Sequence, residues 1–234
     1  MKRMYYVMLL AFALTSCDVM KTVAQPGAGL LTEAEAGSGI KEALGQGLVK
    51  AVLQLNKQDG FFGDAFYKIL LPPDALKAER ALRNIGMGSM LDKAILAINR
   101  GAEDAVGKAT PIFTDAIKSM TLTDALNLVK GGDTSATHFF RTKTTAQLAA
   151  AFAPVIKTSL DKTEATKYYS DVIKAYNGLP TTFRKINPDL QGFVTEKATN
   201  ALFDQVAKEE KNIRQNPLAR GTDLLKKVFG GIKL

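Results

Sequence analysis

The chain has 234 residues, a formal net charge of +8 at pH 7, one cysteine and one histidine. A single cysteine excludes an intramolecular disulfide, and one histidine excludes the usual structural zinc sites, so we expect neither a metal nor another cofactor. The basic balance suits work near an anionic membrane surface, whereas nucleic acid is not an expected partner because no basic run is interleaved with aromatic residues.

The first residues have the pattern of an export signal. Two basic residues precede an apolar run at 4–14, which is too short to span a bilayer but suits the core of a signal peptide. The tetrapeptide Leu14-Thr15-Ser16-Cys17 follows and resembles a bacterial lipobox. That resemblance implies cleavage before Cys17, a diacylglycerol on its thiol and an acylated new amino group. Residues 1–16 are then a signal peptide; an ordinary signal peptide with an incidental cysteine is the alternative.

The predicted lipid sets the expected location. One acyl chain holds a protein on a membrane only marginally, whereas two or more hold it stably. We therefore expect a lipoprotein of the bacterial cell envelope that faces the periplasm and is anchored through Cys17, with residues 17–31 as its lipidated start and flexible tether. Asp18 resembles the inner-membrane retention signal of enterobacterial lipoproteins. Other phyla sort lipoproteins differently, so the inner and the outer membrane both stay open.

Residues 32–234 have the pattern of a single compact all-α domain of roughly nine helices. Thr32 and Glu35 have the spacing of a capping box at its start. Apolar residues then recur with the helical period along the segments 40–55, 91–106, 148–156, 168–176, 194–213 and 224–232. No segment alternates with period two for long enough to predict a strand.

The segment GGDTSATHFFRTKT, residues 131–144, contains the only histidine and the highest density of polar residue types. Its two glycines end one helix, and a residue of 133–135 can cap the next, predicted over 136–141. The threonines of 142–145 offer caps for a further helix at 146–156. The segment is therefore expected at a junction of three helices.

The same segment holds the candidate ligand-binding residues, which are Asp133, His138, Arg141 and Lys143. Arg141 and Lys143 could bind an anion near exposed helix N-termini. In the structural interpretation, which we favour, Asp133 caps a helix, Arg141 pairs with a carboxylate and His138 is partly exposed.

The end of the chain supplies two candidate structural polar residues. In the segment 216–223 Arg220 is expected to join a buried pair, and Asp223 to open the last helix. That helix has an apolar face and a basic edge, which suits packing on the domain or, less often, lying on an anionic membrane. No catalytic residues are identified, because the chain has no G-x-S-x-G motif and a lipidated Cys17 is not a free nucleophile.

Several of these motifs occur together in one known family. They are I-K-E-A-L-G-Q-G-L at 40–48, L-P-P-D-A at 71–75, G-G-D-T-x-A-T-x-F-F-R-x-K-T at 131–144 and N-P-L-A-R-G-T-D-L-L-K-K-V-F-G at 216–230. The combination resembles a bacterial family of envelope proteins known as domain-of-unknown-function family 4197. The resemblance implies a helical domain behind a signal peptide. It implies no activity and supplies no catalytic residues.

Three hypotheses follow. The preferred one is a membrane-anchored, non-enzymatic module that binds an envelope protein or a small ligand. The second is an envelope hydrolase or transferase that uses the polar cluster at 133–143, with Asp133, His138 and Arg141 as its working residues. The third is a helical oligomerisation module.

Overall fold

The computed structural model describes residues 32–84, 86–162, 164–178, 185–187, 189–223 and 226. Within these ranges no residue forms a strand, which confirms the all-α prediction. The helices in order are α1 (Glu33–Asn56), the 3-10 helix η1 (Pro73–Ala75), α2 (Leu76–Asn84), α3 (Gly88–Val106), α4 (Ala109–Ser119), α5 (Leu122–Lys130), α6 (Ser135–Lys162), α7 (Ala165–Asn177), α8 (Leu190–Gln215) and η2 (Pro217–Ala219). The expected count of nine is not confirmed, because the helix predicted at 224–232 lies almost wholly outside these ranges. The predicted signal peptide, Cys17 and tether lie outside them as well.

The first helix begins as its sequence predicts. The Thr32 hydroxyl accepts the Glu35 backbone N–H at 3.2 Å, and the Glu35 carboxylate accepts the Thr32 N–H at 2.9 Å. This reciprocal capping box satisfies two backbone donors that a helix start otherwise leaves open. The apolar face predicted over 40–55 is buried, from Ile40 to Leu55. Here local sequence is sufficient to define both the start and the inner face of the helix.

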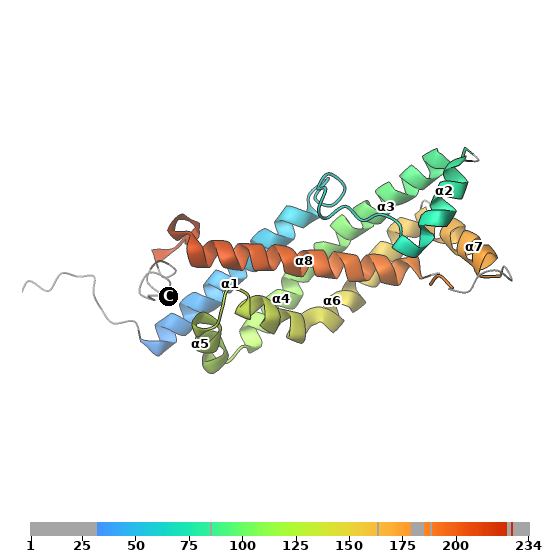
Figure 1. Ribbon diagram of the computed structural model, residues 1–234. Helices are drawn as coiled ribbons and strands as arrows, with labels where there is room; N and C mark the ends of the chain where they lie inside the picture. Colours follow the sequence, from blue (N-terminus) through green and yellow to red (C-terminus); the bar gives the residue numbers. More distant parts are fainter. Residues whose placement is uncertain are drawn as a thin grey trace, which may run out of the picture. The chain divides into compact units, whose positions relative to one another are not determined.

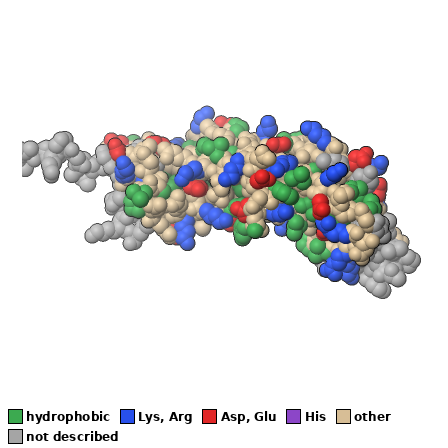
Figure 2. Space-filling model, turned by 90° about the horizontal axis from the view of Figure 1, so that it is seen from above, with side chains coloured by type: hydrophobic (Ala, Val, Ile, Leu, Met, Phe, Trp, Pro, Cys, Tyr) green, Lys and Arg blue, Asp and Glu red, His purple; other side chains and the backbone are tan. Residues whose placement is uncertain are grey.

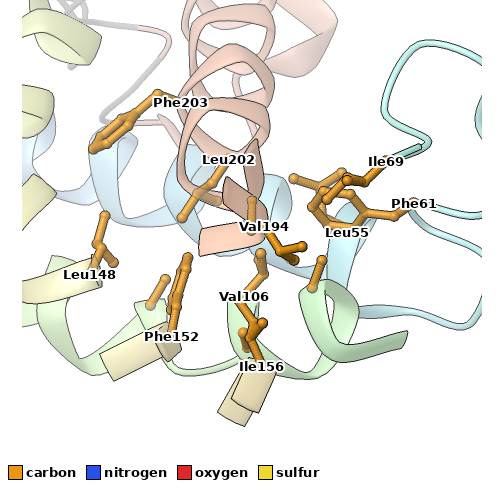
Figure 3. Packing of buried hydrophobic residues seen from close by; sticks show 14 of the residues in the cluster. Leu55, Phe61, Ile69, Val106, Leu148, Phe152, Ile156, Val194, Leu202 and Phe203 are labelled. Atoms are coloured by element: carbon orange, nitrogen blue, oxygen red, sulfur yellow. The ribbon is translucent and has the colours of Figure 1, made fainter. Parts of the chain in front are cut away.

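Helix α8 lies against α1, α3 and α6, and α3 also packs along α6 (Figure 1). In Figure 3 Phe152 and Ile156 of α6 and Val106 of α3 point toward Val194 and Leu202 of α8. All five side chains are fully shielded from solvent, and each such side chain contributes about 1.5–3 kcal/mol through its burial. The core therefore holds α8 in place, and α8 in turn presents the side chains described below.

The predicted break between 141 and 146 is wrong, because α6 runs without interruption from Ser135 to Lys162. The hydroxyls of Thr142, Thr144 and Thr145 do not cap a new helix but donate to the carbonyl four residues earlier, at 2.6–3.0 Å. Threonine makes this bond within a helix and so does not have to start one. Pro154 also lies inside this helix.

The connection between α1 and η1, residues 57–72, crosses α3 and is fixed there by two buried polar side chains. Glu103 Oε1 accepts the two successive backbone N–H groups of residues 61–62, at 3.1 and 3.2 Å. Asn99 accepts the N–H of Ile69 at 2.9 Å and donates to its carbonyl at 2.8 Å. A non-helical segment is thereby held rigidly beside α8. Among the residues that the structure describes, no helix has both the length and the apolar character needed to cross a membrane.

Candidate functional site

The N-terminus of α6 binds a carboxylate from this same chain. Glu210 of α8 is 8 % exposed, and its Oε1 accepts the backbone N–H of Ala136 at 3.0 Å. Its Oε2 accepts the N–H of Thr137 at 2.9 Å and the Thr137 hydroxyl at 2.8 Å. A helix N-terminus favours an anion because its first N–H groups lack helical partners. At this helix start, Glu210 already fills that role.

Arg214 completes the cluster from one turn further along α8. Its guanidinium is 5 % exposed at the side chain and donates to Glu210 Oε1 at 2.8 Å. It also donates to the carbonyl of Leu128 at 2.7 Å and to the Ser135 hydroxyl at 2.8 Å. The end of α5, the start of α6 and the end of α8 are thus joined by one buried ion pair. This accounts for the polar side chains of Ser135 and Thr137 as parts of the fold.

The two structural polar candidates lie just beyond α8. Arg220 donates to the carbonyls of Ile213 at 3.2 Å and Arg214 at 2.9 Å, so it binds the carbonyl groups at the end of that helix. Asp223 is exposed and lies 3.0 Å from the Lys226 ammonium. Arg220 therefore stabilises a helix C-terminus, where a cation is favoured.

The four candidate ligand-binding residues occupy the start of α6 and the turn before it. Asp133 is exposed and accepts a hydrogen bond from the Gln215 amide at 3.1 Å. His138 is exposed on the first turns of α6. Lys143 is exposed, and its ammonium lies 5.9 Å from the centre of the Phe139 ring.

Arg141 is the half-buried member of the four. Its guanidinium donates to Asn200 Oδ1 at 2.8 Å and lies 4.7 Å from the centre of the Phe203 ring. Its partners on α8 are thus an amide and an aromatic ring. Arg141 binds Asn200 of α8, whereas Asp133 is bound by Gln215 of the same helix. These two α8 residues are roughly four turns apart, about 22 Å along the helix axis. Asp133 and Arg141 therefore do not converge on one point, which removes the geometry that a joint catalytic role requires.

A different part of the surface is hollowed. Residues 66–76 and the first half of α8 enclose an open groove of about 530 Å³, walled by Phe66, Leu70 and Leu76 on one side and by Phe193 on the other. Phe66 is 73 % exposed and Leu70 is 53 % exposed, although both are large apolar side chains. Figure 2 shows green apolar patches between acidic and basic side chains on one face of the molecule. Exposed apolar groups that cluster in a concavity are typical of a binding site.

A hydrogen-bonded cluster fixes the groove wall to α8. The Tyr67 hydroxyl lies 2.6 Å from Asp204 Oδ2 and 2.9 Å from Gln205 Oε1, and it accepts a hydrogen bond from Lys208 Nζ at 2.7 Å. Lys208 also pairs with Asp204 at 3.0 Å. Burial, followed by the hydrogen bond to Asp204, raises the pKa of Tyr67 to about 12. The hydrogen bond to Tyr67 raises the pKa of Lys208 above its usual value.

These pKa directions restrict the chemistry of the cluster. A tyrosine or lysine acts as a base or a nucleophile only when it loses its proton, which a lowered pKa favours. The raised pKa of each group disfavours loss of its proton, so neither is suited to act as a base or a nucleophile. What the cluster does is hold the wall of the groove to α8 through its hydrogen bonds. Among the described residues, no group of three or more histidine, cysteine, aspartate and glutamate side chains is arranged to hold a metal ion.

The groove was not predicted from the sequence. One signal was available, because FYKILLPP at 66–73 combines large apolar residues with a lysine in a stretch that has no helical period. The α8 half of the groove gave no signal, since Phe193 and Lys197 fit an ordinary amphipathic helix. Tyr67 and Asp204, which lie in the two walls, are 137 positions apart, and no local pattern indicates such a pairing.

Comparison with known proteins adds the family and no activity. No curated protein and no solved structure matches the chain. The family described as "Protein of unknown function (DUF4197)" matches residues 30–230, which includes every segment that builds the groove and the Glu210 cluster. The chain therefore belongs to the DUF4197 family.

Proposed function

We propose that this protein is a bacterial envelope lipoprotein, anchored through Cys17 on the periplasm-facing side of a membrane, and that its helical domain is a non-enzymatic module that binds a small ligand with an apolar body. The groove between residues 66–76 and α8 is the observation that carries the binding role. The lipobox pattern Leu14-Thr15-Ser16-Cys17 supports the anchor.

The groove has the properties of a ligand site. Its volume of about 530 Å³ falls within the roughly 300–1,000 Å³ typical of small-molecule pockets. Its wall is already ordered without a ligand. Asn99 forms hydrogen bonds with the backbone N–H and carbonyl of Ile69, and the Tyr67 hydroxyl is hydrogen-bonded to Asp204 of α8. A preformed wall lowers the ordering cost of binding. Covering Phe66 and Leu70 would remove exposed apolar surface from water, which is the expected source of affinity.

The anchor is tested by a single substitution. The protein with its original Cys17 should incorporate a labelled fatty acid in bacterial cells and fractionate with membranes. Cys17→Ala should lose the label, because the thiol that receives the diacylglycerol is gone. Equal labelling of the two forms would contradict the anchor, and so would membrane retention of Cys17→Ala in cells that cleave its leader.

The binding site is tested with a fluorescent reporter. The chain has no tryptophan, so Phe66→Trp places a single indole on the groove rim. Leu53→Trp, on α1 and outside the groove lining, is the matched control at another strongly exposed apolar position. The protein for this test begins at residue 32 and so avoids detergent; residues 31–234 form a compact unit, and the buried cluster from Ile40 to Val206 stays whole.

A dodecyl amphiphile, added below its micelle concentration, should shift the emission of Phe66→Trp to shorter wavelength in a saturable way. It should leave the emission of Leu53→Trp unchanged. Leu70→Asp, introduced beside the Phe66→Trp reporter, should weaken the response because it places a charge on the apolar wall. An unchanged emission in a domain that still unfolds cooperatively would contradict the proposed site.

A further inference from the structure

Resting on that proposed function, we infer that the ligand is an anionic single-chain amphiphile. Its apolar chain lies along Phe66, Leu70 and Leu76, and its acidic head group pairs with Lys68 and Lys197.

The charged side chains of the groove indicate an anionic head group. The charged side chains in its lining are Lys68, Lys197 and Asp204. Asp204 already lies 3.0 Å from the Lys208 ammonium and 2.6 Å from the Tyr67 hydroxyl. Neither Lys68 nor Lys197 forms an ion pair with a carboxylate in the part of the chain that the structure describes. The lining therefore contains two lysines that form no ion pair among the described residues, and its one carboxylate, Asp204, already pairs with Lys208.

Both ammonium groups are placed by aromatic rings. Lys68 Nζ lies 4.0 Å from the centre of the Phe62 ring, and Lys197 Nζ lies 5.5 Å from that of Phe193. A cation over a ring face is attracted by the ring but donates no hydrogen bond to an oxygen there. An ammonium has three N–H donors, so each lysine keeps donors for an anionic head group. Phe193 also lines the apolar part of the groove, so charge and apolar surface are adjacent.

The concave form favours a monomeric amphiphile over a membrane surface as the occupant. Docking on a flat bilayer needs no concavity, whereas Phe66, Leu70, Leu76 and Phe193 line a hollow of small-molecule size. The wall is also fixed, since Tyr67 and Ile69 are bonded to α8 and α3. An acidic peptide is the other class with matching charge, and it becomes an outcome of the test.

Calorimetric titration of the domain from residue 32 with three dodecyl amphiphiles tests the inference. Laurate is anionic, dodecyl maltoside is neutral and dodecyltrimethylammonium is cationic, and all are used as monomers. Laurate should bind about tenfold more tightly than the neutral amphiphile, because two part-exposed ion pairs each contribute modestly, and the cationic one should bind weakest. Lys68→Gln with Lys197→Gln should remove the preference for laurate while binding of dodecyl maltoside stays unchanged.

Two controls separate charge from other effects. The double variant with arginine at positions 68 and 197 should keep the preference, since the charge is retained. Lys108→Gln, an exposed lysine outside the groove lining, should bind laurate as the parent protein does.

The outcomes distinguish the two proposals. Equal affinity for laurate and dodecyl maltoside would overturn the anionic ligand and leave the apolar groove in place. No binding of any amphiphile, together with a silent Phe66→Trp reporter, would overturn both. Binding to vesicles that contain phosphatidylglycerol without binding of monomeric laurate would overturn it in favour of a membrane surface. Binding of an acidic apolar peptide but not of laurate would overturn it in favour of a protein partner.

Discussion

Glu210→Ala tests whether the buried cluster at the start of α6 is a structural element. The substitution removes the carboxylate that accepts two α6 backbone N–H groups and the Thr137 hydroxyl. It also removes the counter-charge of Arg214, whose side chain is 5 % exposed. Breaking a buried ion pair by deleting one partner costs about 3–5 kcal/mol. Since domains are typically stable by about 5–15 kcal/mol, this is a large share of the free energy of unfolding.

The adjacent residue supplies a matched control. Glu209 pairs with Lys50 at 3.4 Å, and the lysine side chain is 60 % exposed. An ion pair of this kind contributes about 0–1 kcal/mol, so Glu209→Ala should cost little. Urea unfolding followed by far-UV circular dichroism measures both variants. A loss below about 1 kcal/mol for Glu210→Ala would refute the structural role that we assign to the pair. The double variant Glu210→Ala with Arg214→Met should also cost less than the sum of its single variants.

Three further predictions concern other parts of the domain. The raised pKa of Tyr67, about 12, means that the folded state holds its proton longer than an unfolded chain, so stability should be steady below about pH 10 and fall toward pH 12. Tyr67→Phe should flatten that fall in urea titrations at a series of pH values. Gly101→Ala should destabilise by about 1–3 kcal/mol, because its Cβ would lie 2.9 Å from Ser159 Cβ where α3 meets α6; thermal unfolding measures this. His138→Ala should change stability by less than about 0.5 kcal/mol and leave laurate binding unchanged, since the side chain is exposed and outside the groove lining.

Local pattern was sufficient for much of the fold. The buried faces of α1 and α3, and the capping box at Thr32, follow from residues at most a few turns apart, and the structure confirms them. The helix boundary predicted inside α6 was wrong. A threonine hydroxyl can cap a helix start, but it can also donate to the carbonyl four residues earlier within a continuous helix. Phe140 and Leu148, on either side of the threonines at 142–145, are both buried in the continuous helix, and packing between distant segments is not visible in a local sequence pattern.

The candidate site was harder to predict because its partners are distant in sequence. Of the two helix boundaries predicted at 131–144, the structure has the first, between α5 and α6, and not the second. The anion that binds at the α6 start comes from Glu210, whose partner Ala136 is 74 positions away. The groove likewise depends on a non-helical segment held beside α8 by Asn99 and Tyr67. The roles of Asp133, His138, Arg141 and Lys143 in ligand binding stay a prediction.

The most direct test of the groove as an anionic-amphiphile site is a crystal structure of the domain with laurate. The alkyl chain should lie along Phe66, Leu70 and Leu76. The carboxylate should lie within about 4 Å, the usual ion-pair distance, of the ammonium of Lys68 or Lys197. Laurate bound elsewhere, or bound in the groove with its carboxylate away from both lysines, would contradict the proposed site.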